Sequence, residues 1–451
     1  MLRRRERVPR KLIPLTLALL LIGVILATYR IQQATAQPKT WIVDDDGPAD
    51  FSGIQEAVNA SSDGDTIFVK PGSYSAGIYV AKNISIVAES QDVVINANNG
   101  IGSAIVLVAG NVSISGFTIL AGDTGIMVGA GTKDEPVRRV VSRNRIMNAQ
   151  DSGIFVYWSN GALITENTFV NNYYAIRTRN SNCTINRNLF ENNLYGIIRK
   201  EDNRASAYSE NTFKNNAIGI DLGFFDDRSV QIKIYHNNFQ NNTINAQPYE
   251  RVRNAWDNGY PCGGNYWSDY NGSDADDDGI GDSSYVIDEY NVDAYPLVAP
   301  VNAFDAGTWN GEIYNVDVAS SFTVSDFQIN ETQKAMSFNV TGFDGASGFC
   351  RVIVPNAVSQ GLWQTSFSVL LDDNPQAYKK WLDSANTYIY VSYTHSEHRI
   401  TIRQEQPSTT SLLSPEVIAS IALLVVLLII AATIVRKRLR RKPETSKTMI
   451  H

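Results

Sequence analysis

A short unit of alternating apolar and polar positions recurs along the middle of the chain. Each copy begins with an asparagine and has an apolar residue two positions later; most copies then have a small residue and an isoleucine about eight positions on. Successive copies start 23, 21, 23 and 26 residues apart, at Asn144, Asn167, Asn188, Asn211 and Asn237. A period of this length indicates a solenoid, in which each repeat is stabilised by its neighbours.

The spacing inside each unit favours strands over helices. Apolar residues fall in pairs separated by one residue, as in the stretch 184–190, and lack the helical period that a long amphipathic helix requires. Short strands joined by asparagine and glycine turns explain this pattern, and stacked asparagine side chains can bond from coil to coil. A coil of three short strands takes roughly 20 to 25 residues. We therefore predict an all-β fold whose main body, residues 37–300, is a right-handed parallel β-helix.

Residues 51–60 are expected to cover the first coil. They read as a short amphipathic helix with Ile54, Ala57 and Val58 on one face. Ser52 is the predicted N-cap, with Gln55 three residues on. A solenoid needs such a cap because its terminal coil otherwise exposes an apolar end.

The asparagine repeat stops near residue 300, and a different strand pattern follows. Residues 301–405 contain separate alternating runs, at 321–324, 336–340, 351–354 and 388–393. Strands at such spacing predict a small β-sandwich. Residues 406–416 are expected to form a short stalk rich in serine and threonine.

Two apolar segments, one near each end, indicate the compartment. The first segment follows six basic residues and precedes Ala34-Thr35-Ala36, so residues 1–36 read as a signal peptide cleaved after Ala36 or as a retained signal anchor. Residues 417–435 carry no charge and are long enough to cross a bilayer. Because the basic stretch 436–451 follows at once, we expect this tail in the cytoplasm and residues 37–415 outside, on the cell membrane.

Charge and cysteine content restrict the partners. The formal net charge is -7, but residues 37–415 hold 25 basic and 43 acidic residues, which argues against nucleic acid as a partner. The odd set of Cys183, Cys262 and Cys350 gives no disulfide framework. Eight glycosylation sequons lie in the predicted outside region, which suits a glycoprotein, at Asn59, Asn83, Asn111, Asn182, Asn241, Asn271, Asn330 and Asn339.

An aspartate-rich stretch near the end of the predicted β-helix has the spacing of a calcium loop. Oxygen ligands alternate around Gly279 as in an EF-hand-like loop, supplied by Asp274, Asp276, Asp278, Ile280 (backbone) and Asp282. The twelfth position, where a glutamate is expected, is Tyr285, so Asp269 or Asp288 would have to substitute. The sequence predicts a structural calcium ion; a solvated acidic turn is the alternative.

Side chains beside the repeated isoleucines define a candidate binding face. Strand residues alternate sides, so when each isoleucine points inward, Phe155, Arg177, Ile198 and Asp221 point outward in one row. Aromatic and cationic side chains stacked in this way can bind a glycan, and the predicted glycan-binding residues are Tyr157, Arg177, Arg179, Lys200 and Asp221. An ordinary polar surface is the alternative. A catalytic face needs paired carboxylates, for which Asp202, Asp226 and Asp227 are further candidates.

The two ends of the repeat region resemble a known family. Residues 41–47, 54–57 and 63–74 resemble the opening of NosD-like, carbohydrate-associated β-helix surface proteins common in archaea, and residues 264–270 resemble the end of the same module. The resemblance implies the fold; proteins of this fold include lyases, hydrolases, adhesins and stalks. NosD relatives are linked to copper, for which four histidines, five methionines and three dispersed cysteines offer little.

The function we expect is that of a membrane-anchored extracellular protein that binds glycans or acts as an envelope scaffold without catalysis. Its expected partners are an extracellular polysaccharide or envelope glycan and the membrane. Two alternatives stay open: a cell-surface polysaccharide lyase or glycoside hydrolase, and a NosD-like accessory factor for a metalloenzyme.

Overall fold

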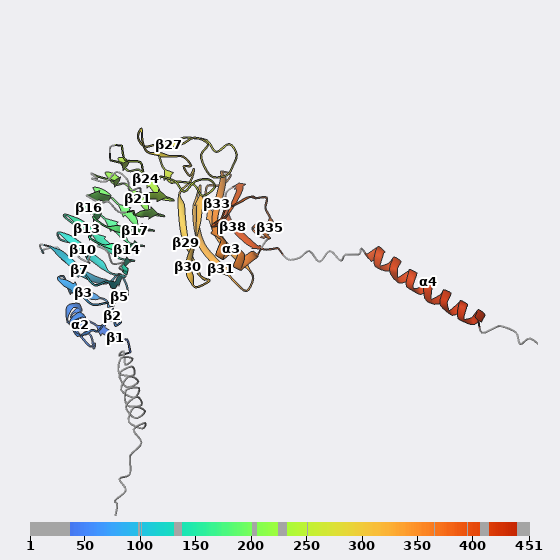
Figure 1. The fold of residues 1–451 in the computed structure, drawn as a ribbon, viewed down its shortest axis with the longest axis horizontal. Coiled ribbons are helices and arrows are strands. Elements are labelled where there is room, and N and C mark those ends of the chain that lie inside the picture. Colours follow the sequence, from blue (N-terminus) through green and yellow to red (C-terminus); the bar gives the residue numbers. More distant parts are fainter. Residues whose placement is uncertain are drawn as a thin grey trace, which may run out of the picture.

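The protein consists of a β-solenoid, a β-sandwich beside it and a C-terminal apolar helix (Figure 1). The computed structural model describes residues 37–97, 100, 102–129, 138–200, 205–223, 232–249, 251–364, 366–394, 396–405 and 415–439. The predicted signal segment 1–36, most of the predicted stalk and the tail beyond residue 439 lie outside the described residues. The predicted order of a parallel β-helix, a β-sandwich and an apolar helix is confirmed.

Three parallel sheets form the walls of the solenoid. Sheet A contains β1 (Thr40–Val43), β2 (Thr66–Val69), β5 (Ser85–Ala88), β8 (Asn111–Ser115), β11 (Arg138–Ser142), β14 (Asn160–Thr165), β17 (Asn182–Asn186), β20 (Ala207–Ser209) and β23 (Lys233–Tyr235). Sheet B contains β3 (Gly72–Ser75), β6 (Val93–Asn96), β9 (Thr118–Leu120), β12 (Arg145–Met147), β15 (Thr168–Val170), β18 (Leu189–Glu191), β21 (Thr212–Lys214), β24 (Asn238–Gln240) and β26 (Tyr266–Trp267). Sheet C contains β4 (Ile78–Val80), β7 (Ser103–Leu107), β10 (Thr124–Gly129), β13 (Ser152–Tyr157), β16 (Tyr174–Arg179), β19 (Tyr195–Lys200), β22 (Ile218–Asp221) and β25 (Ile244–Gln247).

A ladder of buried asparagine side chains runs along the corner between sheets A and B. The Oδ1 atom of each member accepts hydrogen bonds from the backbone N and the Nδ2 of the member before it; from Asn188 to Asn211 both distances are 3.0 Å. The Nδ2 of each member also donates to a carbonyl of the preceding coil, as Asn211 does to Ile185 at 2.8 Å. The members are Asn144, Asn167, Asn188, Asn211, Asn237 and Asn265. The predicted coil-to-coil bonding of asparagines is therefore confirmed.

A second ladder and a column of stacked rings complete the repeating interior. Asn172, Asn193, Asn216 and Asn242 bond in the same way at the corner between sheets B and C. Inside sheet B, neighbouring ring centroids lie 4.2 to 5.1 Å apart along the column Phe169, Phe190, Phe213, Phe239, Trp267 and Tyr285. Each coil thus pairs its corner asparagines and stacks its rings through its neighbours.

Left-handed backbone at the corners explains where the asparagines are needed. At the corner between sheets B and C the residue with positive φ is itself an asparagine, as at Asn171 and Asn192, which suits a residue that tolerates this region. At the other corner the positive φ falls on the residue before the ladder asparagine, for example Arg187 and Glu210. The ladder asparagines are thus selected by their hydrogen bonds and not by their φ angle.

A short helix closes the first end of the solenoid. Helix α2 (Ile54–Ala60) buries Ile54, Ala57 and Val58, as predicted. The predicted N-cap is wrong, because Gly53 occupies that position and no side chain caps the helix. The side chain of Gln55 instead accepts a hydrogen bond from the backbone N of Tyr79 at 2.6 Å, which ties the helix to sheet C.

The other end of the ladder finishes on a carboxylate. The Oδ2 atom of Asp293 accepts hydrogen bonds from the backbone N of Asn265 at 2.7 Å and from Nε1 of Trp267 at 2.9 Å. Asp293 lies in β28 (Val292–Asp293), which pairs with β27 (Tyr285–Val286) in a small hairpin over the last coil. Burial raises the pKa of Asp293 to about 7, although these N–H donors lower it.

Two antiparallel sheets with a shared core form the sandwich. One sheet contains β29 (Val301–Trp309), β30 (Glu312–Ser320), β33 (Ser347–Pro355), β37 (Asn386–Thr394) and β36 (Lys379–Leu382). The other contains β31 (Thr323–Asn330), β32 (Ala335–Thr341), β38 (Glu397–Gln404), β34 (Phe367–Leu371) and β35 (Asn374–Pro375). Helix α3 (Asn356–Trp363) packs its buried side chains against the same core.

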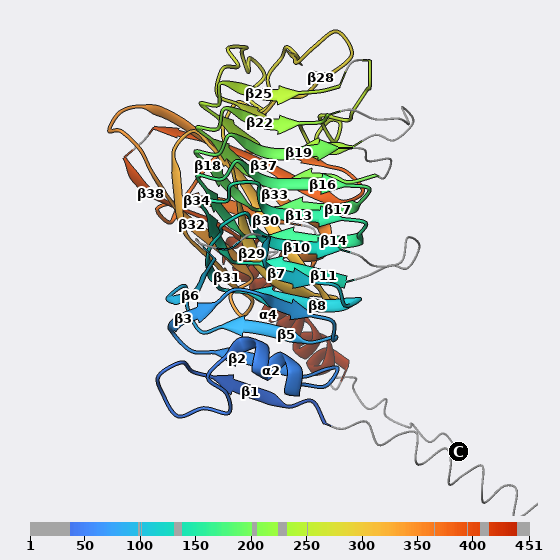
Figure 2. The same ribbon diagram turned by 90° about the vertical axis from the view of Figure 1, so that its left-hand side faces the viewer.

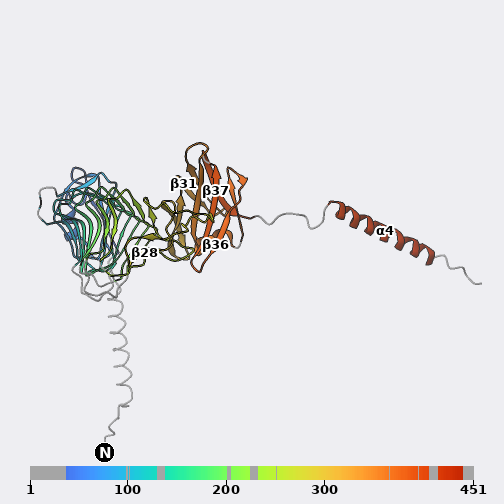
Figure 3. The same cartoon turned by 90° about the horizontal axis from the view of Figure 1, so that it is seen from above.

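The sandwich lies along the corner between sheets A and B (Figures 1 and 3). Asn238 on β24 exchanges two hydrogen bonds of 2.7 Å with the backbone of Val301. Arg187 donates to Asn315 at 3.0 Å, two coils away along the same corner. These contacts join the two domains through specific polar pairs.

Helix α4 (Pro415–Leu439) is the predicted apolar helix. Its stretch Ala419–Arg438 has a mean hydropathy of 2.6 and is long and apolar enough to cross a membrane. The described side chains of this helix are exposed in the isolated chain.

Removing one rung of the ladder should destabilise the solenoid. In Asn211→Ala the buried N of Asn188 and the carbonyl of Ile185 lose their partners, which should cost about 3 kcal/mol. Thermal unfolding of the full chain in lipid nanodiscs, followed by tryptophan fluorescence, should show a midpoint roughly 5 to 10 °C lower. The exposed Gln333→Ala serves as control, since its side chain makes no hydrogen bond within the described residues and carries no glycosylation sequon. An unchanged midpoint for Asn211→Ala would contradict a stabilising ladder.

Asp293 should make the stability depend on pH. Its pKa of about 7 in the folded state exceeds its ordinary value of 3.8, so its contribution is full below about pH 4 and is lost as the pH rises through 7. The difference between these two pKa values corresponds to roughly 4 kcal/mol of unfolding free energy. Asp293→Asn should flatten the fall in unfolding temperature between pH 5 and about pH 8, whereas the exposed Asp344→Asn should not. Parallel pH profiles for the wild type and Asp293→Asn would rule this out.

Candidate functional site

The outer face of sheet C carries the predicted glycan-binding residues. Strand register aligns Phe155, Arg177, Ile198 and Asp221 on successive coils. It also aligns Tyr157, Arg179 and Lys200 in a second row. The register therefore aligns the positions of both rows, and their role in glycan binding stays a prediction. Figure 2 shows this sheet on the near side of the solenoid and the sandwich on the far side.

Cationic side chains stack on aromatic rings across neighbouring coils of this face. The guanidinium of Arg177 lies 4.7 Å from the ring centroid of Phe155, and that of Arg179 lies 5.9 Å from the ring of Tyr157. The carboxylate of Asp151 holds Arg177 from the side at 3.2 Å. Each arginine is thus oriented by a ring on the adjacent coil.

A tyrosine cluster that the sequence interpretation missed extends the face. Tyr174 and Tyr195 are paired in register on β16 and β19, with ring centroids 5.1 Å apart, and Tyr173 packs edge-on against Tyr174 at 4.6 Å. The Nζ of Lys200 lies 5.3 Å from the ring of Tyr174. Burial and Tyr173 raise the pKa of Tyr174 to about 12, so its phenol stays neutral. The tyrosines recur one period apart, a signal that the sequence contains.

Two residues of the predicted rows behave differently from the others. Ile198 is only 3% exposed and offers no surface for a ligand. The Oδ1 of Asp221 accepts a hydrogen bond from the backbone N of Gly223 at 2.9 Å, which gives it a part in the chain turn. The further carboxylates considered for catalysis, Asp202, Asp226 and Asp227, lie outside the described residues.

The aspartate-rich loop brings together three of its predicted ligands. Asp274, Asp276 and Asp278 each offer a carboxylate oxygen, and these atoms lie within 4.8 Å of one another. The loop turns at Gly279, whose φ of 84° suits glycine. Burial raises the pKa of both Asp274 and Asp278, and the neighbouring carboxylates raise it further. A cation would relieve this crowding.

The other predicted ligands of the loop are engaged elsewhere. The Oδ2 of Asp282 accepts hydrogen bonds from Ser273 and Ala275, both at 2.9 Å. Asp269 accepts a bond from the hydroxyl of Tyr285, and Asp288 accepts bonds from the backbone of residues 290 and 291. Ile280 is buried and would contribute only its backbone carbonyl. The cluster therefore consists of three aspartates.

Basic residues of the sandwich reach the backbone of this loop. Arg351 donates to the carbonyl of Asp278, and Lys379 donates to that of Asp276 at 2.6 Å. Lys379 also lies 3.4 Å from the carboxylate of Asp277. The acidic loop is thus a docking element for the sandwich, and its three clustered aspartates could hold a metal ion.

A second acidic triad lies at the opposite end of the solenoid. Asp44, Asp45 and Asp46 also have carboxylate oxygens within 4.8 Å of one another. Two of them already accept hydrogen bonds from backbone N–H groups: Asp44 from Gly47 at 3.1 Å, and Asp45 from Ser73 at 2.9 Å. The sequence interpretation used these residues only for the family resemblance.

A buried Cys–His–Asp arrangement joins the two domains. The Nδ1 of His236 lies 2.9 Å from Oδ2 of Asp317 in the sandwich, and its Nε2 lies 3.5 Å from Sγ of Cys262. Burial lowers the pKa of His236, but Cys262 and Asp317 raise it well above its ordinary value. Since His236 and Cys262 are each 3% exposed, these groups hold the interface together and offer no accessible nucleophile.

The repeating coils and the polar outer sheet define a β-solenoid protein of the parallel β-helix class. Residues 58–272 match the family described as periplasmic copper-binding protein (NosD), so this part of the chain is a NosD-family β-helix domain. Over 105 residues the chain is 34% identical to a cell surface glycoprotein of Methanothermus fervidus. That match covers 23% of this chain and spans 17% of the glycoprotein's length.

Two solved structures share the solenoid architecture at low similarity. A pectin methylesterase from carrot is 12% identical with a TM-score of 0.31, over 48% of this chain and 85% of that chain. The phiAB6 tailspike, solved with oligosaccharides of Acinetobacter baumannii surface polysaccharide, is 11% identical with a TM-score of 0.26, over 75% and 73%. At these scores neither likeness carries an argument about activity.

The copper in the family description does not fit the described ligands. Both groups of three metal-ligating side chains found among the described residues consist of aspartates only. Carboxylates suit hard cations such as calcium and magnesium, whereas imidazole and sulfur ligands suit copper.

Proposed function

We propose that this chain is a membrane-anchored cell-surface protein that binds an extracellular or envelope glycan through the outer face of sheet C. The observation that carries the proposal is the alternation of stacked rings and cations across successive coils, led by Arg177 over Phe155. Helix α4 and the relation to a cell surface glycoprotein support the location. The acidic charge of residues 37–415 disfavours nucleic acid as a partner.

The chemistry of the face suits a long polymer. Aromatic faces pack against the C–H faces of sugar rings, and arginine and lysine pair with carboxylate or sulfate groups. Because aromatic and cationic side chains lie in register on the coils of β13, β16 and β19, the face offers neighbouring subsites to a repeating chain. The carboxylate nearest to Arg177 is Asp151, which is already bound by that arginine. A binding role without catalysis follows best from this arrangement.

We further propose that Asp274, Asp276 and Asp278 hold a structural calcium ion. Their crowded carboxylates and the glycine turn support an oxygen-ligated cation at the junction of solenoid and sandwich. The ion would stabilise the loop on which Arg351 and Lys379 dock.

Arg177→Ala should weaken glycan binding. Loss of the stacked cation should reduce the affinity of the full chain in nanodiscs for an acidic polysaccharide about tenfold, or roughly 1.4 kcal/mol. Arg177→Lys should recover only part of the affinity, because an ammonium lacks the planar stacking group. Affinity electrophoresis measures the change, and polymer length before and after incubation reports on cleavage.

The matched control is Arg143→Ala, an exposed arginine at the corner between sheets A and B. It should bind as the wild type does. An equal loss of affinity in both arginine variants would mean that only the net charge of the protein matters. A shortened polymer would indicate that the protein cleaves the glycan, which would contradict a purely binding role.

Calcium should stabilise the protein through the loop. A calcium concentration about a hundredfold above the dissociation constant adds about 2.7 kcal/mol and should raise the unfolding temperature of the wild type. Asp276→Asn should abolish the increase without breaking an internal hydrogen bond of its carboxylate. Asp46→Asn, in the other triad, should retain it. Retention in Asp276→Asn together with loss in Asp46→Asn would assign the ion to residues 44–46 instead.

A further inference from the structure

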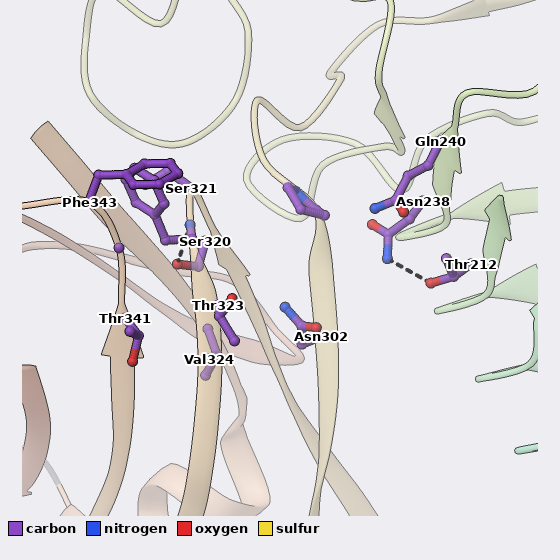
Figure 4. Close-up of a pocket in the computed structure, with 13 residues that line it drawn as sticks. Thr212, Asn238, Gln240, Asn302, Ser320, Ser321, Thr323, Val324, Thr341 and Phe343 are labelled. Atoms are coloured by element: carbon purple, nitrogen blue, oxygen red, sulfur yellow. Dashed lines mark hydrogen bonds between the residues drawn. The ribbon is translucent and has the colours of Figure 1, made fainter. Parts of the chain in front are cut away.

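A cleft between the solenoid and the sandwich is separate from the sheet C face. Its volume is about 730 Å³, within the range of roughly 300 to 1,000 Å³ of ligand pockets. Figure 4 shows Asn238 and Gln240 on the solenoid side and Asn302, Thr323 and Thr341 on the sandwich side. Ligand sites occur preferentially at such junctions of domains.

The lining of this cleft is uncharged. None of its residues is acidic or basic, although residues 37–415 contain 68 charged side chains. The lining consists of hydroxyl, amide and apolar side chains: Thr212, Asn238, Gln240, Pro300, Asn302, Ser320, Ser321, Phe322, Thr323, Val324, Thr341, Gly342 and Phe343. An anionic ligand would find no cation here, and a cationic ligand would find no carboxylate.

Several polar side chains of the cleft have unused hydrogen-bonding capacity. Asn238 bonds to Thr212 and Val301 and helps to fix the solenoid wall. By contrast, the side chains of Gln240, Asn302, Thr323 and Thr341 make no hydrogen bond within the part of the chain that the structure describes. Two amides and two hydroxyls therefore remain available on opposite walls, which suits a ligand rich in hydroxyl groups.

An aromatic pair stands at the sandwich side of the same cleft. Phe343 is 79% exposed, and its ring lies 6.0 Å from that of Phe322 in an edge-to-face arrangement. The second ring supports the first, so that one face of a phenyl group stays presented at the sandwich edge of the cleft, across from Gln240. Sugar rings have an apolar C–H face and a polar rim, and this combination matches them.

We propose that this interdomain cleft is a second binding site, which takes a neutral oligosaccharide. Phe343 stacks on one sugar ring, while Gln240 and Asn302 bond to hydroxyl groups from opposite walls. Because the cleft lacks charge, it selects neutral sugars, in contrast to the cationic face of sheet C. The site does not depend on the function proposed for that face.

The test uses the full chain in nanodiscs and three neutral probes, namely glucose-, mannose- and galactose-based tetrasaccharides, with tetragalacturonate as the anionic probe. Saturation-transfer NMR and calorimetry should detect binding of at least one neutral probe. Phe343→Ala should weaken that binding at least tenfold, and Asn302→Ala by several fold. Ile313→Ala, which removes an apolar side chain 75% exposed on β30, is the control and should have no effect.

Three outcomes would overturn the proposal. The first is the absence of binding by every neutral probe at millimolar concentration. The second is neutral binding that Arg177→Ala abolishes and Phe343→Ala leaves intact, which would place all sugar binding on sheet C. The third is a change in oligomeric state for Phe343→Ala without any change in sugar binding, which would make the cleft a contact between copies of the chain. Loss of tetragalacturonate binding alone bears only on sheet C.

Discussion

The asparagine ladder between sheets A and B is the interaction on which the rest of this structure depends. Each buried amide donates to a carbonyl of the preceding coil, and each asparagine before the last makes two further bonds to the next one, so a misplaced coil would leave several buried polar groups without partners. Such groups are expensive to bury unpaired, whereas the apolar interior alone would tolerate a shifted register. The ladder therefore fixes the height of every coil relative to its neighbours, and the ring column from Phe169 to Tyr285 stacks within that register.

The fixed register creates the outer face of sheet C. Since strand residues alternate sides, each coil that aligns its asparagine also aligns the outward side chain beside its inward isoleucine. Arg177 comes to lie over Phe155 because the two residues are in register on adjacent coils, and Lys200, in register with Arg179, comes within reach of the ring of Tyr174. The proposed binding role thus uses side chains whose mutual geometry is set by groups buried on the other side of the sheet.

Polar and charged side chains cover the last coil of the solenoid. Asp293 ends the ladder, and the acidic loop beyond β26 meets Arg351 and Lys379 of the sandwich. Nearby, His236 bonds across the junction to Asp317. A solenoid end must be covered, and here the cover is the β27–β28 hairpin with the acidic loop, on which the sandwich docks. The same junction leaves the uncharged cleft between Gln240 and Phe343.

The sequence by itself determined the repeating part of this protein. The period of the asparagines predicted the β-helix, the alternation predicted the rows that contain Phe155 and Arg177, and the long apolar run predicted helix α4. Only the tertiary structure decided that Asp282 lies outside the triad of Asp274, Asp276 and Asp278, that Gly53 and not Ser52 is the N-cap of helix α2, and that His236 pairs with Asp317. The reason is physical: contacts between coils repeat at a fixed separation and leave a periodic pattern, whereas contacts between solenoid and sandwich join distant residues once and leave none.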